Sequence, residues 1–186
     1  MDNGLFSTAM MLTDKVVAQV NEANLHKPTP CTEWDVEKLT NHMLVELVWL
    51  APLLEGKTIA EVGSKYDGDL LNGDAGAAWL QYCREASAAM QTADPAAMAH
   101  LSYADKSNQA YVDEVAADII VHGWDLAQAL GVEYMLDDKT CDAVLAAAKD
   151  VLPMAREGGM VAPEVTVDQN SSKMEKLLAA YGRSTN

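Results

Sequence analysis

The chain has 186 residues, of which 49% are apolar, and this size favours one compact domain over residues 1–186. Its formal net charge of −15 disfavours binding to nucleic acid or to anionic membrane surfaces. The longest apolar run, residues 43–54, is interrupted by Glu46 and Pro52 and is too short to span a bilayer. The first residues lack the basic start of a secretory signal, so we expect a cytoplasmic protein.

Several common functional motifs are missing from the sequence. The three cysteines, Cys31, Cys83 and Cys141, are far apart and indicate neither a disulfide framework nor a CxxC-type zinc or redox site. The sequence also lacks glycine-rich phosphate-binding motifs, the H-E-x-x-H zinc motif and the G-x-S-x-G nucleophile motif. Nucleotide binding, metzincin-type proteolysis and serine hydrolysis therefore lose their usual sequence support.

Apolar residues recur at helical spacing along the amino-terminal half, and no long stretch alternates with a period of two. A first helix is expected over residues 3–23. The second helix is expected to begin with Asp35 as its N-cap and to end at Gly56. A third follows the candidate cap Asp74 and should stop before Pro95, because proline restricts the residue before it.

The carboxyl-terminal half continues the helical pattern. A fourth helix is expected from Asn108 to Gly131, where the glycine suits a left-handed C-cap. A fifth is expected over residues 139–156 with a kink at Pro153, and a Ser-x-x-Glu capping box predicts a last short helix over residues 173–182. Several long helices with short connections predict an all-α fold of the bundle type.

Two polar residues lie where the fourth helix should bury hydrocarbon. At about 100° per residue, an apolar stripe forms along residues 111–129, and His122 falls near its middle. Asp118 lies on the same face one turn earlier, because positions i and i+4 stack along a helix. An unpaired carboxylate buried there would cost several kcal/mol, so a compensating partner such as a divalent metal ion is expected.

The second helix offers a similar pair, His42 and Glu46, four residues apart at the border of its apolar stripe. If the two helices are neighbours, four potential ligands converge inside the bundle, where bundle metal sites are built. Imidazole nitrogen with carboxylate oxygen suits zinc, nickel, iron or manganese without choosing among them. Asp125, three residues after His122, leans toward the same side and could orient a ligand.

Simpler explanations compete with the metal site. A histidine on an apolar helix face is more often a hydrogen-bonded core residue than a ligand, so Asp118 and His122 could form a buried polar pair without metal. Asp125 could equally stabilise its own helix. Cys31 is expected to be a small buried residue rather than a reactive thiol. The four tryptophans are expected in the core or at a dimer interface.

Two longer motifs carry a family resemblance: TPCTEWDVEKLTNHM at residues 29–43 and VHGWDLAQALG at residues 121–131. Together with EKLLAAYGR at residues 175–183, they resemble the actinobacterial metal-binding branch of the DinB-like superfamily. That branch is related to the amino-terminal domain of mycothiol-dependent maleylpyruvate isomerase. The resemblance covers most of the chain and implies a DinB-like four-helix bundle with additional short carboxyl-terminal helices.

The resemblance also implies a ligand set, in which one histidine of the second helix and an acid-x-x-x-histidine pair of a later helix hold a divalent metal ion. In this sequence those residues are His42, Asp118 and His122. Many DinB relatives have a histidine at the position of Asp118, and the isomerase has a glutamate there. Glu46 is then expected to act as a fourth ligand or as a catalytic base, and zinc is the first choice of metal, before nickel, iron or manganese.

Relatives of this kind include thiol-dependent transferases and isomerases, in which a metal ion stabilises a thiolate. The resemblance therefore implies a homodimeric metalloenzyme, a transferase, isomerase or hydrolase, that acts on a small-molecule substrate with a low-molecular-weight thiol such as mycothiol. The chain is shorter than the full isomerase with its carboxyl-terminal domain, so isomerisation of maleylpyruvate itself is not expected. The alternative is a non-catalytic bundle in which a metal ion or small ligand serves regulation or structure.

Overall fold

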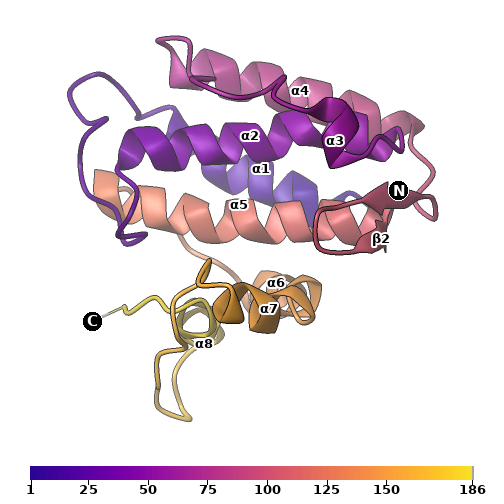
Figure 1. Ribbon diagram of the computed structural model, residues 1–186. Helices are drawn as coiled ribbons and strands as arrows, with labels where there is room; N and C mark the ends of the chain where they lie inside the picture. Colours follow the sequence, from indigo (N-terminus) through magenta and orange to yellow (C-terminus); the bar gives the residue numbers. More distant parts are fainter. Residues whose placement is uncertain (186) are drawn as a thin grey trace.

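The computed structural model describes residues 1–185 and has an all-α architecture, as the sequence predicts (Figure 1). Four long helices form the bundle: α1 (Gly4–Val17), α2 (Val36–Leu54), α4 (Ala75–Thr92) and α5 (Asn108–Leu130). The single-turn helix α3 (Ile59–Val62) lies in the connection between α2 and α4. None of the helices within residues 1–185 is long and apolar enough to cross a membrane.

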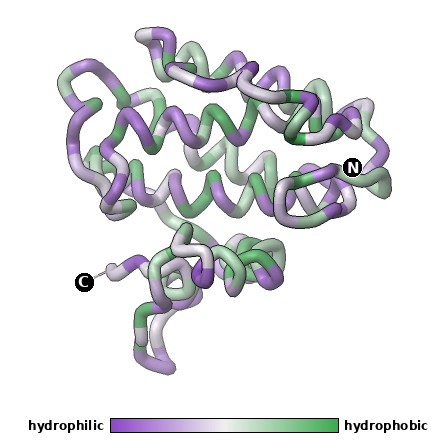
Figure 2. The backbone as a smooth tube through the Cα atoms, viewed as in Figure 1, coloured by the Kyte–Doolittle hydropathy of each residue, from purple (hydrophilic) through white to green (hydrophobic). Residues whose placement is uncertain are grey.

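The bundle is held together by the apolar faces of its long helices. The helix α1 packs on α5, and α2 packs on both α4 and α5. The largest fully buried side chains include Leu39 and Leu47 of α2, Trp79 of α4, and Ile119 and Leu126 of α5. Burying a leucine or isoleucine contributes about 1.5–3 kcal/mol. Hydrophobic and hydrophilic residues alternate along these helices (Figure 2), and the packing brings α2 beside α5.

Three short helices form a second layer against one side of the bundle (Figure 1). They are α6 (Asp138–Ala147), α7 (Val151–Glu157) and α8 (Lys173–Ala180). The helix α6 packs against α5, and α8 packs against α6. Buried Leu177 and Leu178 of α8 join the same hydrophobic core as the bundle residues, so this carboxyl-terminal layer is packed onto the bundle.

Four of the helix ends that the sequence marked are confirmed. Asp35 and Asp74 each accept a hydrogen bond from a backbone N–H in the first turn of α2 and α4. Gly131 follows α5 with a φ of 70° in the left-handed region. Ser172 and Glu175 form the reciprocal capping box at the start of α8.

The first helix ends at Val17, so the expected extension to residue 23 is wrong. Two asparagine side chains explain the early end. The side-chain amides of Asn21 and Asn24 both donate to the Gln19 carbonyl, at 2.9 and 2.8 Å. Short polar side chains that bond nearby backbone groups compete with helix continuation, and here they favour turns.

The expected helix over residues 139–156 is also wrong, because it is divided into α6 and α7. The division lies at residues 148–150, three positions before Pro153. It places Pro153 in the first turn of α7, where a missing N–H leaves no intrahelical hydrogen bond unmade. The proline therefore restarts the helix instead of kinking it.

A small antiparallel hairpin between α4 and α5 was not anticipated. Its strands are β1 (Met98–His100) and β2 (Asp105–Ser107), with buried Ala99 opposite Lys106. Strands of three residues are too short to reveal an alternating pattern in the sequence. His100 lies on β1 and contacts Asp105, with 2.9 Å between Nδ1 and Oδ1.

A close approach beside the candidate site gives a first prediction. A Cβ at Gly123 of α5 would lie 2.6 Å from both the Thr13 and the Tyr134 hydroxyl oxygens, which bond each other at 3.3 Å. Both partners are buried, so Gly123→Ala should lower the free energy of unfolding by about 1–3 kcal/mol in denaturant titrations. The control Gly76→Ala, whose nearest neighbour is 3.6 Å away, should change it by less than about 1 kcal/mol. Equal effects of the two variants would contradict the close packing.

Candidate metal centre

The helices α2 and α5 bring His42, Asp118 and His122 together. The Asp118 carboxylate lies between the two imidazoles, with Oδ2 at 3.0 Å from His42 Nε2 and Oδ1 at 3.5 Å from His122 Nε2. One ligand atom from each of the three residues lies within 4.8 Å of the others. The three residues singled out in the sequence therefore form one cluster between two helices.

The donor set of this cluster fits a divalent metal ion. Ligands at about 2.0–2.2 Å from a tetrahedral ion lie roughly 3.4 Å from one another. The two distances at Asp118, 3.0 and 3.5 Å, are close to that spacing, and they involve different carboxylate oxygens, so an ion would be held by both oxygens or after a small rotation of the carboxylate. The side chain of His122 is 9% exposed, whereas those of His42 and Asp118 are 24% and 34% exposed. One side of the cluster therefore faces solvent, where a further ligand could approach.

Asp118 controls the protonation of the cluster. Burial acts against the charged form of His42, but the negative charge of Asp118, together with their hydrogen bond, outweighs burial and raises the pKa of His42 to about 9. Burial also acts against ionised Asp118, but the charges of His122 and His42 hold the pKa of Asp118 below its usual range. Without a metal ion, the cluster is a carboxylate paired with a protonated imidazole at neutral pH.

Glu46 lies one turn after His42 on α2 and is half-buried. Burial and the negative charge of Asp118 raise the pKa of Glu46 above its ordinary value, while His42 opposes that shift. Within residues 1–185, the group of ligand atoms around Asp118 does not include Glu46. A carboxyl group with a raised pKa beside such a cluster suits proton transfer better than it suits metal ligation.

A second row of contacts supports His122 from behind. The Nδ1 atom of His122 lies 3.0 Å from Oδ2 of Asp125, which is fully buried. Asp125 therefore contacts His122 and can orient it, as considered from the sequence. Arg183 was not predicted as a site residue. Its Nη2 atom lies 2.6 Å from Oδ2 of the same carboxylate.

Cys31 contributes to a second compact group with His122 and Asp125. The guanidinium of Arg183 already neutralises Asp125, so a second cation at this group would be electrostatically disfavoured. Burial raises the pKa of the Cys31 thiol, so the thiol is not activated as a nucleophile. Cys31 is half-buried, and the expectation of a small packed residue describes it better than that of a reactive one.

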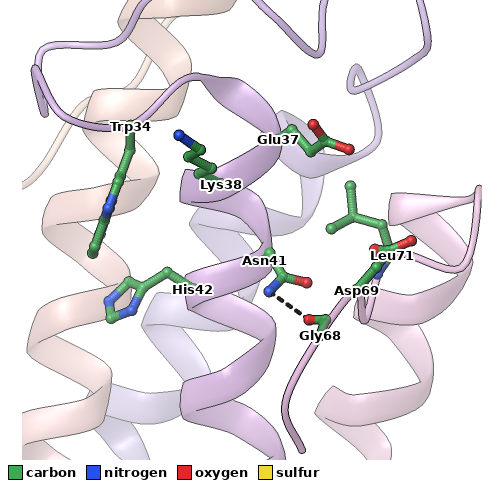
Figure 3. A pocket seen from close by; sticks show the side chains of 8 residues that line it. All are labelled: Trp34, Glu37, Lys38, Asn41, His42, Gly68, Asp69 and Leu71. Carbon is green, nitrogen blue, oxygen red and sulfur yellow. Dashed lines mark hydrogen bonds between the residues drawn. The ribbon is translucent and has the colours of Figure 1, made fainter.

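An open pocket of about 400 Å³ adjoins the cluster at His42 (Figure 3). Its walls come from the start of α2 and from the loop before α4. On the loop side, Asn41 donates to the Gly68 carbonyl and accepts from the Leu70 N–H, at 3.1 and 2.7 Å. Lys38 adds a cation to a wall that also carries carboxylates. The size lies in the range of small-molecule sites.

Trp34 joins this pocket to the cluster. Its ring centroid lies 4.6 Å from that of His42 and 5.5 Å from that of His122, and its side chain lies beside His42 in Figure 3. The tryptophans were expected in the core or at a dimer interface, and half-buried Trp34 packs against the edge of the core beside the cluster. The indole also covers one side of both imidazoles and lines the pocket.

Comparison with known proteins identifies the family of the chain. Residues 6–127 match the family described as mycothiol maleylpyruvate isomerase N-terminal domain. The chain belongs to this family. The matched segment includes His42, Asp118 and His122, and it ends before the carboxyl-terminal layer that carries Arg183. The family resemblance inferred from the sequence motifs is therefore confirmed.

Two relatives match this chain over most of its length. They are uncharacterized proteins of Mycobacterium tuberculosis, from strains CDC 1551 / Oshkosh and ATCC 25618 / H37Rv. Each is 28% identical over 174 residues, which cover 90% of this chain and 90% of the relative. No solved structure gave a significant match.

The charge of the cluster gives a second prediction. In metal-free protein, NMR titration of His42 should give a pKa of about 9, and Asp118→Asn should lower this pKa, because only the charge of Glu46 then opposes the effect of burial. Since the pKa of His42 is raised in the folded state, the ion pair stabilises the fold fully below pH 6.5 and loses that contribution as pH rises through about 9. A wild-type pKa of 6.5 or lower would contradict the pairing.

Proposed function

We propose that this protein is a metalloenzyme that binds one divalent metal ion through His42, Asp118 and His122 and acts on a small molecule. The observation that carries the proposal is the spacing of three donor atoms from two helices, within 4.8 Å of one another, at a cluster with a solvent-facing side. Three protein ligands with an open position are typical of catalytic metal sites, whereas structural zinc sites are usually closed by four.

The donor chemistry favours zinc. Two imidazoles and one carboxylate form the ligand set of several catalytic zinc sites. The same set also binds iron in oxygenases, and nickel and manganese accept nitrogen and oxygen ligands, so the choice among them is experimental. A bound divalent ion would lower the pKa of a thiol or a water next to it, which is the chemistry that the residues around the site would use.

We assign Glu46 the role of general base or acid, because its raised pKa brings it closer to neutral pH and it interacts electrostatically with His42 and Asp118. The pocket beside His42 is proposed to receive the substrate, with the Trp34 indole as an apolar wall and Lys38 as a nearby cation. Membership of a mycothiol-related family supports a low-molecular-weight thiol as the co-substrate. The reaction would be a transfer, an isomerisation or a hydrolysis on a small electrophile.

One observation favours the alternative of a non-catalytic bundle. The three side chains already contact one another at 3.0 and 3.5 Å, so the cluster can satisfy its own polar atoms and stabilise the contact between α2 and α5. In that case a metal ion or small ligand would serve structure or regulation. The homodimer and the cytoplasmic location expected from the sequence stay predictions.

Metal content is the first test. Wild-type protein supplied with zinc should carry about one equivalent by mass spectrometry of the metal, and His42→Ala, Asp118→Ala or His122→Ala should each remove most of it. The control His26→Ala changes an exposed histidine that lies near Asp35 and Glu37, in a separate group of possible ligands. It should leave the metal content unchanged. A wild-type content below about a tenth of an equivalent after supply of zinc, nickel, iron and manganese would sink the metal proposal.

The role of Glu46 is tested by Glu46→Gln, which keeps the shape of the side chain and removes its acid–base function. The variant should retain its metal and lose about 100-fold or more in turnover of a thiol with an electrophilic acceptor. Glu55→Gln, at the exposed end of α2, is the matched control and should turn over normally. Unchanged turnover in Glu46→Gln would remove Glu46 from the mechanism. Absence of turnover in metal-loaded wild type with every thiol tested would favour the non-catalytic bundle.

A further inference from the structure

We propose that Arg183, at the end of the carboxyl-terminal layer, is a positioning residue for the metal centre. It acts through Asp125, which contacts the candidate ligand His122. The proposal rests on the proposed metal function and adds a residue that lies outside the matched family segment. It implies that the carboxyl-terminal layer helps to shape the site in the bundle.

The contacts form a continuous buried row. The Nη2 and Nε atoms of Arg183 lie 2.6 and 3.2 Å from the two oxygens of Asp125, which is the two-point geometry of strong guanidinium–carboxylate pairs. Asp125 Oδ2 lies 3.0 Å from His122 Nδ1. Asp125 is 0% exposed, and Arg183 and His122 are 9% and 7% exposed. Solvent therefore screens these interactions only weakly.

The local sequence explains how Arg183 reaches this position. After α8, Gly182 adopts a φ of +77°, its N–H bonds the Ala179 carbonyl, and the Arg183 N–H bonds the Leu178 carbonyl. This pair of bonds is the Schellman ending of a helix, which reverses the chain direction. A Cβ at Gly182 would lie 2.6 Å from the Cβ of Ala162, so a side chain there would disturb the turn. The turn sends the next side chain, Arg183, back toward α5.

The chemistry of the row would fix the orientation of His122. An ionised carboxylate only accepts hydrogen bonds, so the proton between His122 and Asp125 belongs to Nδ1 of the histidine. With the proton on Nδ1, the other ring nitrogen, Nε2, which faces Asp118, is the one left to bind a metal ion. Arg183 pairs with Asp125 and holds it aligned, because a buried carboxylate without a cationic partner would be strongly disfavoured. Such outer contacts typically change metal affinity by about 10- to 100-fold.

The decisive experiment compares two arginines of the carboxyl-terminal layer. Arg183→Met should weaken zinc binding by about 10- to 100-fold in competition with a chelator of known affinity. Arg156→Met is the matched control, because Arg156 also holds α8, through the Ala180 carbonyl, but its other partner is Glu164 on the surface. Arg156→Met should lower the stability of the fold. It should change zinc affinity by less than about 3-fold, which is a smaller change than the loss of a contact behind a metal ligand causes. Arg183→Lys keeps a cation beside Asp125 and should restore part of the lost affinity.

A second measurement does not depend on metal. Long-range nitrogen–proton NMR spectra of metal-free wild type should show the His122 proton on Nδ1, and Arg183→Met should change the His122 nitrogen shifts while Arg156→Met should not. If wild type binds no metal, the proposed function fails, and this measurement still tests the row of contacts. If wild type binds zinc and Arg183→Met matches Arg156→Met in affinity and spectrum, the positioning role is overturned.

Poor folding of Arg183→Met would call for the double variant Asp125→Asn/Arg183→Met, which leaves no unpaired buried charge. The double variant should also bind zinc at least about 10-fold more weakly than wild type, because the charge behind His122 is gone. Wild-type affinity in the double variant, with unchanged His122 spectra, would overturn the proposal.

Discussion

Asp118 brings a negative charge to the contact between α2 and α5, where its side chain is partly covered and cationic partners stabilise it. Two imidazoles from two different helices supply them, one on each oxygen. The contact therefore depends on a positive charge that is shared among three side chains. A proton on His42 supplies that charge in the metal-free protein, and a divalent cation could supply it in a loaded one. In this sense the same arrangement that stabilises the fold is also suited to a metal ion.

The elements around the cluster fix its position and leave one side of it open. Leucines of α2 and isoleucines of α5 hold the two helices at a fixed distance, while the loop before α4 is tied to Asn41 and leaves a pocket open at His42. On the other side of His122, a buried ion pair connects the bundle to the carboxyl-terminal layer. The cluster thus has a solvent-facing side and a rigid rear, a combination that suits a site where a small molecule approaches and the ligands must not move.

Much of this could be predicted from the sequence, because the deciding signals were local. Helical periodicity gave the bundle, Asp35 and Gly131 marked helix ends, and the i to i+4 spacing placed Asp118 and His122 on one face. His42 reaches that pair because α2 packs beside α5. This packing is tertiary, and residue spacing within one helix does not encode it. Arg183 and Trp34 were missed for the same reason, although Gly182 before Arg183 was a signal of a chain reversal. The predicted helix ends were wrong where asparagine side chains or Pro153 competed with a longer helix.

The position of Trp34 has a consequence for how the site can be observed. Its indole lies against both imidazoles, at 4.6 and 5.5 Å between ring centroids, and the face of an aromatic ring attracts a nearby cation. Any change in the charge of those rings alters the electronic surroundings of the indole directly. The indole is therefore placed so that a change of charge at the cluster would alter its fluorescence, which is one of four tryptophan contributions to the emission of the protein.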